Sequence, residues 1–87
     1  MWIYTILGDL MNLNEATKRR INEVCKQKNI KIAEACLNSG MSPSPIYDLF
    51  KNRTKSPTII TLKRFCSGAG ITLAEFFSKD YFNDFEE

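Results

Sequence analysis

Residues 36–57 read CLNSGMSPSPIYDLFKNRTKSP. A small residue at Cys36 is followed four positions later by Gly40, and aliphatic residues follow at Ile46 and Leu49. This spacing lets two short helices cross closely around a tight turn, because the small residue and the glycine leave room for the crossing. The stretch therefore predicts a helix-turn-helix, and DNA binding is the leading hypothesis for its function.

The composition limits what else the chain could do. Its 87 residues, 44% of them hydrophobic, are enough for one compact domain with a modest core. The sequence contains no histidine, which removes the commonest general base and the commonest metal ligand. No nucleophile and base can be assembled from neighbouring motifs either. We therefore expect a protein that is not an enzyme and that needs no metal or other cofactor.

The three cysteines, Cys25, Cys36 and Cys66, lie in apolar helical patterns and form no CxxC pair. This spacing suggests neither a zinc site nor a disulfide framework, so we expect small buried hydrophobes in a reducing cytosol. The apolar residues 1–10 lack the basic segment and the cleavage site of a signal peptide, and they are about half the length that spans a bilayer. We therefore expect a cytoplasmic protein without a membrane partner.

The charges are unevenly distributed, although the net charge is only +2. Residues 12–66 hold eleven Lys and Arg against four acidic residues, a balance of +7. Residues 72–87 hold one Lys against five acidic residues, a balance of −4, and Asp9 supplies the remaining −1. A basic body is typical of proteins that bind a polyanion, and the acidic end should face away from DNA or engage another protein. Lysines that merely solubilise a small domain would explain the charge equally well.

A basic run, Lys18, Arg19 and Arg20, lies on the first predicted helix. Three consecutive positions fan around a helix, so at most one or two of these side chains can face the same partner. Contact with phosphates and a solvated helix surface both remain open for them.

Capping residues and apolar spacing predict five helices and almost no strand. The expected bounds of the first four helices are 13–28, 31–38, about 43–52 and 57–69. An Asn12 and Glu15 capping pair would begin the first helix, and Gly40 and Gly70 would end the second and the fourth. A Thr72 and Glu75 capping box would begin the last helix. We expect Phe65, Phe76 and Phe77 to be core residues. Three further aromatic residues near the C-terminus are too many for so small a core: Tyr81, Phe82 and Phe85. They suggest a dimer or partner surface, with simple packing on the last helix as the alternative.

The third predicted helix has Ser42 as its expected N-cap and Pro43 in its first position, where the missing amide has no intrahelical partner to lose. Three side chains turn inward: Ile46, Leu49 and Phe50. Four face outward: Ser44, Tyr47, Asp48 and Lys51. Asn52 is expected in the left-handed conformation that ends the helix.

The chain is expected to have three parts: an N-terminal extension at residues 1–11, a helix-turn-helix domain at 12–78 and an acidic aromatic tail at 79–87. Alternation of Trp2, Tyr4 and Ile6 permits a strand in the extension, and a lone strand needs a partner. Since the extension is strongly apolar, we expect it to pack against the domain or against a second copy of the chain.

Taken together, these features resemble the Cro and lambda-repressor-like helix-turn-helix proteins, the XRE family of bacterial and phage regulators. The resemblance covers about residues 13–78. It rests on Cys36, Gly40, Met41, Ser42, Ile46, Leu49, the loop at 51–57 and the sequence GITLAEFF at 70–77. It implies an all-α fold: a compact five-helix lambda-repressor-like DNA-binding domain with its helix-turn-helix at the second and third helices.

The resemblance also implies which residues would meet DNA. The exposed face at the start of the third helix would lie in the major groove and contact base edges through Pro43, Ser44, Tyr47 and Asp48. The following loop and the start of the second helix would bind phosphates through Lys31, Lys51, Asn52, Arg53, Thr54 and Lys55.

Two positions depart from the family pattern. Pro45 stands where the family commonly has Ser or Thr, and we expect it to push Ser44 away from the helical region. Ile32 stands where the family often has a glutamine that contacts a phosphate, so we expect that contact to be missing.

We expect a transcriptional regulator, most simply a repressor, that binds a double-stranded DNA operator as a homodimer on two half-sites, because one module of this size makes few base contacts. The alternative is an antitoxin or other protein-interaction module that uses the acidic aromatic C-terminal end.

Overall fold

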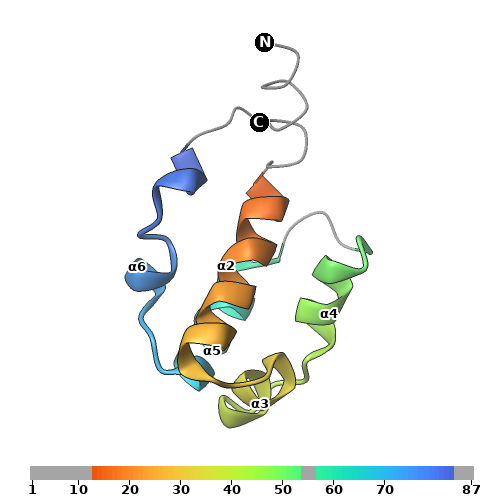
Figure 1. Cartoon of the computed structure of the whole chain (residues 1–87). Coiled ribbons are helices and arrows are strands. Elements are labelled where there is room, and N and C mark those ends of the chain that lie inside the picture. The colour runs from red at the N-terminus through yellow and green to blue at the C-terminus, as the bar shows by residue number, and fades with distance from the viewer. Residues whose placement is uncertain (1–12, 54–56, 84–87) are drawn as a thin grey trace.

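Helices account for all the regular structure in residues 13–53 and 57–83, the part of the chain that the computed structural model describes. The elements are α2 (Leu13–Lys28), α3 (Ile32–Asn38), α4 (Ser44–Phe50), α5 (Ile59–Ala69), α6 (Leu73–Phe76) and a 3₁₀ helix, η1 (Asp80–Asn83). Figure 1 shows α2 running through the middle of the molecule, with α4 on one side and α6 on the other. The predicted all-α fold, with its helix-turn-helix at α3 and α4, is confirmed.

Left-handed residues end four of the described helices. Asn29, Gly40, Asn52 and Gly70 follow α2, α3, α4 and α5 with φ of 53°, 78°, 59° and 84°. Glycine adopts this conformation without a Cβ penalty, and asparagine tolerates it better than most residues. The chain then returns an amide to the helix it has left, as when Met41 N donates to the carbonyl of the residue five positions back at 3.0 Å. The predicted stops at Gly40, Asn52 and Gly70 are confirmed.

Side-chain caps begin α5 and α6, and α5 starts at Ile59 rather than at the predicted residue 57. Thr58 Oγ1 accepts a hydrogen bond from Thr61 N at 3.1 Å at the start of α5. At the start of α6, Thr72 Oγ1 accepts from Glu75 N at 3.0 Å, while the Glu75 carboxylate accepts from Thr72 N at 3.1 Å. These reciprocal bonds form the predicted capping box. The expected cap at Asn12 lies outside the described residues.

The core is built from all five α-helices. Its fully buried large side chains are Ile21, Val24, Cys36, Ile46, Leu49, Phe65, Cys66 and Phe76. Burial raises the pKa of the Cys66 thiol to about 11 and also raises that of Cys36, so these two behave as the small hydrophobes that were predicted. Cys25 is half-buried and packs against the core from outside.

Helices α3 and α5 cross closely at Gly68. A Cβ atom placed on Gly68 would lie 1.6 Å from the backbone oxygen of Ala35, so only glycine fits at that position of α5. Asn38 Nδ2 donates to Gly68 O at 3.2 Å and ties the end of α3 to the same crossing. The first helix of the helix-turn-helix is therefore held by direct backbone contact with α5.

The C-terminal aromatic region differs from the prediction. The last helix ends after four residues, and Phe77, expected in the core, is 37% exposed. Tyr81 and Phe82 are half-buried, and the Phe82 ring lies 6.1 Å from that of Phe76, which agrees with packing on the last helix rather than with a free surface. Where the chain leaves the helix, Ser78 N and Ser78 Oγ both donate to Glu75 O, at 3.2 and 2.7 Å. Phe85 lies outside the described residues.

Candidate nucleic-acid interface

Buried side chains on both sides of the turn hold α3 and α4 in a helix-turn-helix. Ala35 and Cys36 of α3 have no exposed surface, and neither do Ile46 and Leu49 of α4. Between the helices, Met41 is 9% exposed and belongs to the same core cluster. Because α4 is anchored along one side, the direction of its opposite side is fixed as well.

The outward side of α4 carries a continuous polar face. Ser44, Tyr47, Asp48 and Lys51 are spaced i, i+3, i+4 and i+7, which places them on one side of a helix. Ser44 and Lys51 are exposed, Tyr47 is 39% exposed and Asp48 is half-buried. A face of this length, with hydroxyl, carboxylate and ammonium groups in one row, offers donors and acceptors of the kind that base edges and phosphates require.

The start of α4 differs from the prediction by one residue. The helix begins at Ser44, with Pro43 as its N-cap, rather than at Pro43 after Ser42. Ser42 Oγ still accepts from Ser44 N at 3.2 Å, so its hydroxyl caps the entry to the helix. The expectation that Pro45 displaces Ser44 from the helix is wrong, because the amide that Pro45 lacks belongs to the first turn, which has no intrahelical acceptor.

The loop after α4 begins from a defined position. Asn52 takes the left-handed conformation, and Arg53 N donates to Asp48 O at 2.9 Å, closing the helix end. Lys18 Nζ of α2 donates to Asn52 Oδ1 at 2.8 Å. Lys51 and Arg53 are exposed on either side of this anchored asparagine. The predicted phosphate residues Thr54 and Lys55 lie outside the described residues.

Lys31, the other predicted phosphate residue, lies at a different end of the motif. It is the exposed N-cap residue of α3, with an extended backbone and no side-chain cap. Figure 1 places α3 beside the start of α4, whereas residues 51–53 follow the far end of α4. Ile32 is half-buried and packs against the core, so its side chain is used for folding.

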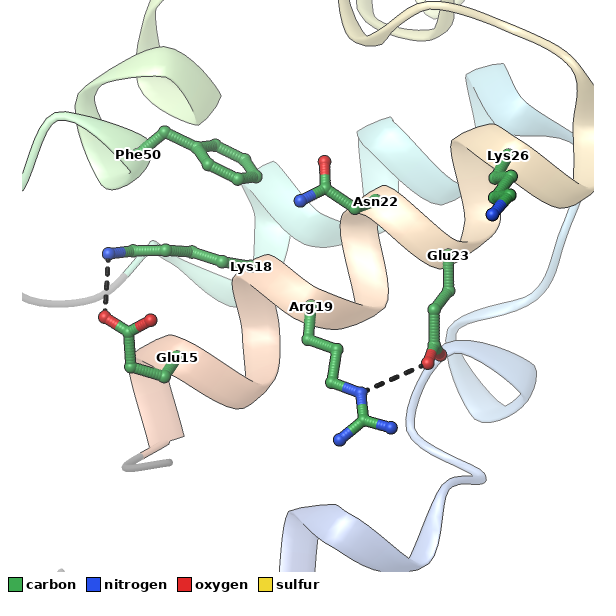
Figure 2. Close-up of a pocket in the computed structure, with 7 residues that line it drawn as sticks. All are labelled: Glu15, Lys18, Arg19, Asn22, Glu23, Lys26 and Phe50. Carbon is green, nitrogen blue, oxygen red and sulfur yellow. Dashed lines mark hydrogen bonds and ion pairs between the residues drawn. The ribbon is translucent and has the colours of Figure 1, made fainter. Parts of the chain in front are cut away.

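The basic run on α2 points in three directions. Figure 2 shows Lys18 and Arg19 on the wall of an open groove of about 580 Å³ between α2 and Phe50. Lys18 pairs with Glu15 at 3.0 Å and Arg19 pairs with Glu23 at 3.3 Å, so acidic neighbours offset both charges. Arg20 turns away into the core and is 5% exposed. The expectation that consecutive basic residues fan around the helix is confirmed.

Arg20 is a structural residue that sequence reasoning did not identify. Its Nε donates to Phe76 O at 2.7 Å and its Nη2 donates to Glu75 O at 2.9 Å. These carbonyls end α6, where a cation is also favoured by the helix dipole. The signal was present in the sequence, because position 20 lies one turn after Ala16 and one turn before Val24, both buried. Arg20 therefore holds α6 on α2.

A second link joins α2 to η1. Tyr81 Oη donates to Glu23 Oε1 at 2.7 Å, and the Arg19 guanidinium lies 4.3 Å from the centre of the Tyr81 ring. Burial favours a higher pKa for the Glu23 carboxyl, but hydrogen bonds from Tyr81 and Arg19 and the charge of Arg20 lower its pKa below the ordinary value. Burial and the bond to Glu23 raise the pKa of Tyr81. The phenol therefore stays protonated as the donor.

Within the described ranges, no three His, Cys, Asp or Glu side chains come together as metal ligands. No helix in those ranges is long and apolar enough to cross a membrane. The interface offers hydrogen-bonding and charged groups on a helix face and a loop.

Comparison with known proteins agrees with this geometry. The model of the Cro/C1-type HTH DNA-binding domain matches residues 20–79, which include α3, the turn, α4 and the capping box. No curated protein and no solved structure matched the chain significantly. The match extends over more than half of the chain and has the exposed α4 at its centre, and so the protein is a DNA-binding member of the Cro/C1-type helix-turn-helix family.

Proposed function

We propose that this protein is a transcriptional repressor that recognises a double-stranded operator by placing α4 in the major groove. The observation that carries the proposal is the outward face of α4, anchored by Ile46 and Leu49 on its opposite side. B-form DNA admits a helix in its major groove, where each base pair presents a distinct pattern of donors and acceptors. A rigid row of polar side chains is suited to that pattern.

The first turns of α4 supply the groups that would contact bases: Pro43, Ser44, Tyr47 and Asp48. The Ser44 hydroxyl can donate or accept, and the Asp48 carboxylate can accept from a cytosine amino group. The Tyr47 side chain can pack on a thymine methyl group or reach a phosphate with its hydroxyl. Good contacts of this kind each contribute roughly 1–3 kcal/mol of discrimination between bases.

Phosphate binding would come from both ends of the motif: Lys31, Lys51, Asn52, Arg53, Thr54 and Lys55. The anchored Asn52 supports this role for the loop, because it fixes the backbone between the exposed Lys51 and Arg53. Such contacts position the helix without reading sequence, and they make the affinity fall as the salt concentration rises.

Two copies of the chain would bind together. One module of this size contacts few bases, so useful affinity favours a homodimer on two half-sites about 34 Å apart. Repression is the simpler output, since an occupied operator excludes polymerase without any further protein contact, whereas activation requires one.

The test is selection of bound sequences from a random duplex pool at moderate salt. Wild type is compared with the double variant Lys51→Glu and Arg53→Glu, which reverses two charges beside Asn52. The matched control, Lys63→Glu with Arg64→Glu, makes the same change of charge at exposed positions on α5. We expect wild type and the control to enrich one palindrome, and the loop variant to enrich none.

Two outcomes would contradict the proposal. Equal loss of selection in both double variants would mean that overall charge, not the loop, drives binding. No enrichment by wild type would favour the protein-interaction alternative. That alternative starts from a smaller exposed aromatic surface than the sequence suggested, because Tyr81 and Phe82 pack on the domain.

A further inference from the structure

An apolar groove lies on the domain where the starts of α2 and α5 meet α6. It has a volume of about 190 Å³, and its walls are Leu13, Asn14, Thr17, Pro57, Ile59, Leu62 and Phe77. None of these side chains is charged. Three of the six large hydrophobic side chains that are exposed in the described ranges belong to it: Leu13, Ile59 and Phe77. Half of the large hydrophobic side chains that are exposed in the described ranges therefore lie at this groove.

The size and chemistry of the groove define what can fill it. An apolar cavity of about 150 Å³ takes a benzene ring, so this groove has room for one aromatic side chain. Burying apolar surface is favourable by roughly 25 cal/mol per Å², whereas a charged group placed there would lose its hydration without finding a partner. The groove fits an apolar segment that includes an aromatic residue.

The chain itself carries such a segment next to the groove. Residues 1–10 read MWIYTILGDL, in which Asp9 is the single charged side chain. The segment is joined through residues 11 and 12 to Leu13, which forms part of the groove wall. A segment tethered this closely has an effective concentration in the millimolar range, which favours docking on its own domain over docking on another molecule.

We propose that residues 1–10 dock in this groove of their own domain, with an aromatic side chain of the segment entering the cavity. The inference does not depend on the proposed repressor function, because it uses only the groove and the adjoining segment. Docking there covers Ile59 and Phe77, and it places the segment against Pro57, directly after the loop that follows α4.

The only tryptophan of the protein, Trp2, lies in this segment, so tryptophan fluorescence reports on it alone. We expect the full chain to show emission at a shorter wavelength than the urea-unfolded chain, and quenching by acrylamide that is several-fold weaker. Both properties should be independent of protein concentration across the range in which sedimentation shows a monomer.

Two variants locate the docking site. Ile59 and Ile60 are each 65% exposed and occupy the first two positions of α5, but only Ile59 lines the groove. Ile59→Asp should move Trp2 emission and quenching towards the unfolded values while the far-ultraviolet circular dichroism is retained. The matched control, Ile60→Asp, should leave both unchanged.

The wild-type measurement tests the proposal even if the Ile59 variant does not fold. Trp2 emission and quenching equal to those of the unfolded chain would overturn it. So would equal responses to Ile59→Asp and Ile60→Asp. Shielding of Trp2 that appears only with a dimer would show that the groove of a second copy is the acceptor, which also contradicts docking within one chain.

Discussion

Replacing Arg20 with methionine should remove the attachment of α6 to α2 while keeping a long side chain in the core. The guanidinium is 5% exposed and donates to the carbonyl oxygens of Phe76 at 2.7 Å and Glu75 at 2.9 Å. Glu75 O also accepts from Ser78, but Arg20 is the donor to Phe76 O within the described residues. The substitution therefore leaves at least one carbonyl without a partner.

The size of the effect follows from these contacts. An unsatisfied buried carbonyl costs roughly 1–3 kcal/mol, and the lost bond to Glu75 O adds about 1 kcal/mol. We expect the Arg20→Met variant to lose about 2–4 kcal/mol of the free energy of unfolding. Since a domain of this size has about 5–15 kcal/mol in total, the loss is a large fraction of its stability.

Urea unfolding followed by far-ultraviolet circular dichroism measures this difference. Since the free energy of unfolding of a small domain falls by about 1 kcal/mol per molar urea, the urea concentration at the unfolding midpoint should fall by about 2–4 M. The control is Arg19→Met on the same helix, whose 54% exposed side chain pairs with Glu23 at 3.3 Å. We expect the control to lose only about 1 kcal/mol. Equal losses of stability in the two variants would contradict the role assigned to the bonds from Arg20 to the end of α6.

Three further substitutions test other contacts. Gly68→Ala should cost about 3 kcal/mol or more in urea unfolding, because its Cβ would lie 1.6 Å from the backbone oxygen of Ala35. Burial raises the pKa of Cys66 from 9.0 to about 11. The contribution of the buried thiol to the free energy of unfolding is therefore fully present below pH 9 and falls as the pH rises towards 11. Cys66→Ala should flatten this alkaline decline, measured as unfolding midpoints at several pH values. The pKa of Glu23 is lowered from 4.5. The contribution of its carboxylate to the free energy of unfolding is therefore present above pH 4.5 and is lost as the pH falls further. Tyr81→Phe should reduce this acid loss, measured as the difference in unfolding free energy between neutral and acid pH.

Specific results would count against each of these expectations. A Gly68→Ala variant within about 0.5 kcal/mol of wild type would mean that α3 and α5 can separate without cost. The matched Gly70→Ala variant meets no atom within 4 Å and should show only the strain of φ +84°. If Cys66→Ala loses as much stability at alkaline pH as wild type, another group causes that loss. In the same way, if Tyr81→Phe loses as much stability at acid pH as wild type, the Tyr81 hydroxyl is not its cause.

The ends of the helices could be predicted because their causes are local. Thr58, the Thr72 and Glu75 pair, and the left-handed stops at Gly40 and Gly70 each act within a few residues of the chain. Side-chain oxygens that cap an amide, and residues that tolerate positive φ, are visible in sequence without any tertiary information. The outward face of α4 was predictable for the same reason, since helical spacing separates it from the buried residues.

The C-terminal helix was overestimated because its end has a tertiary cause. Apolar residues recur from Leu73 to Phe85, which looks like one long helix. In a continuing helix Phe76 O would accept from the amide four residues on, whereas here Arg20 of α2 is its donor. The contact spans 56 positions of sequence, so the helical spacing indicates that position 20 faces the core but not which carbonyl its side chain meets. The same applies to Gly68, whose role depends on where α3 crosses α5.

The structure shows which cations of the basic part of the chain are held within the domain. Lys18 and Arg19 pair with Glu15 and Glu23, two acidic residues that the surplus of +7 in residues 12–66 already includes, and Arg20 donates to backbone carbonyls. The proposed phosphate contacts use four of the eleven cations in this range: Lys31, Lys51, Arg53 and Lys55.

This count gives a prediction for the salt dependence of DNA binding. Each phosphate contact lowers the slope of log affinity against log salt by about 0.9. Four contacts predict a slope of about −3.6 per subunit, whereas a surplus of seven acting without position would give about −6.3. Titration of one operator at several salt concentrations, with the measured slope divided by the number of subunits bound, separates the two values. A slope near −6.3 per subunit would mean that about seven cations of each subunit meet phosphates, and that the loop and Lys31 are only part of the phosphate-binding surface.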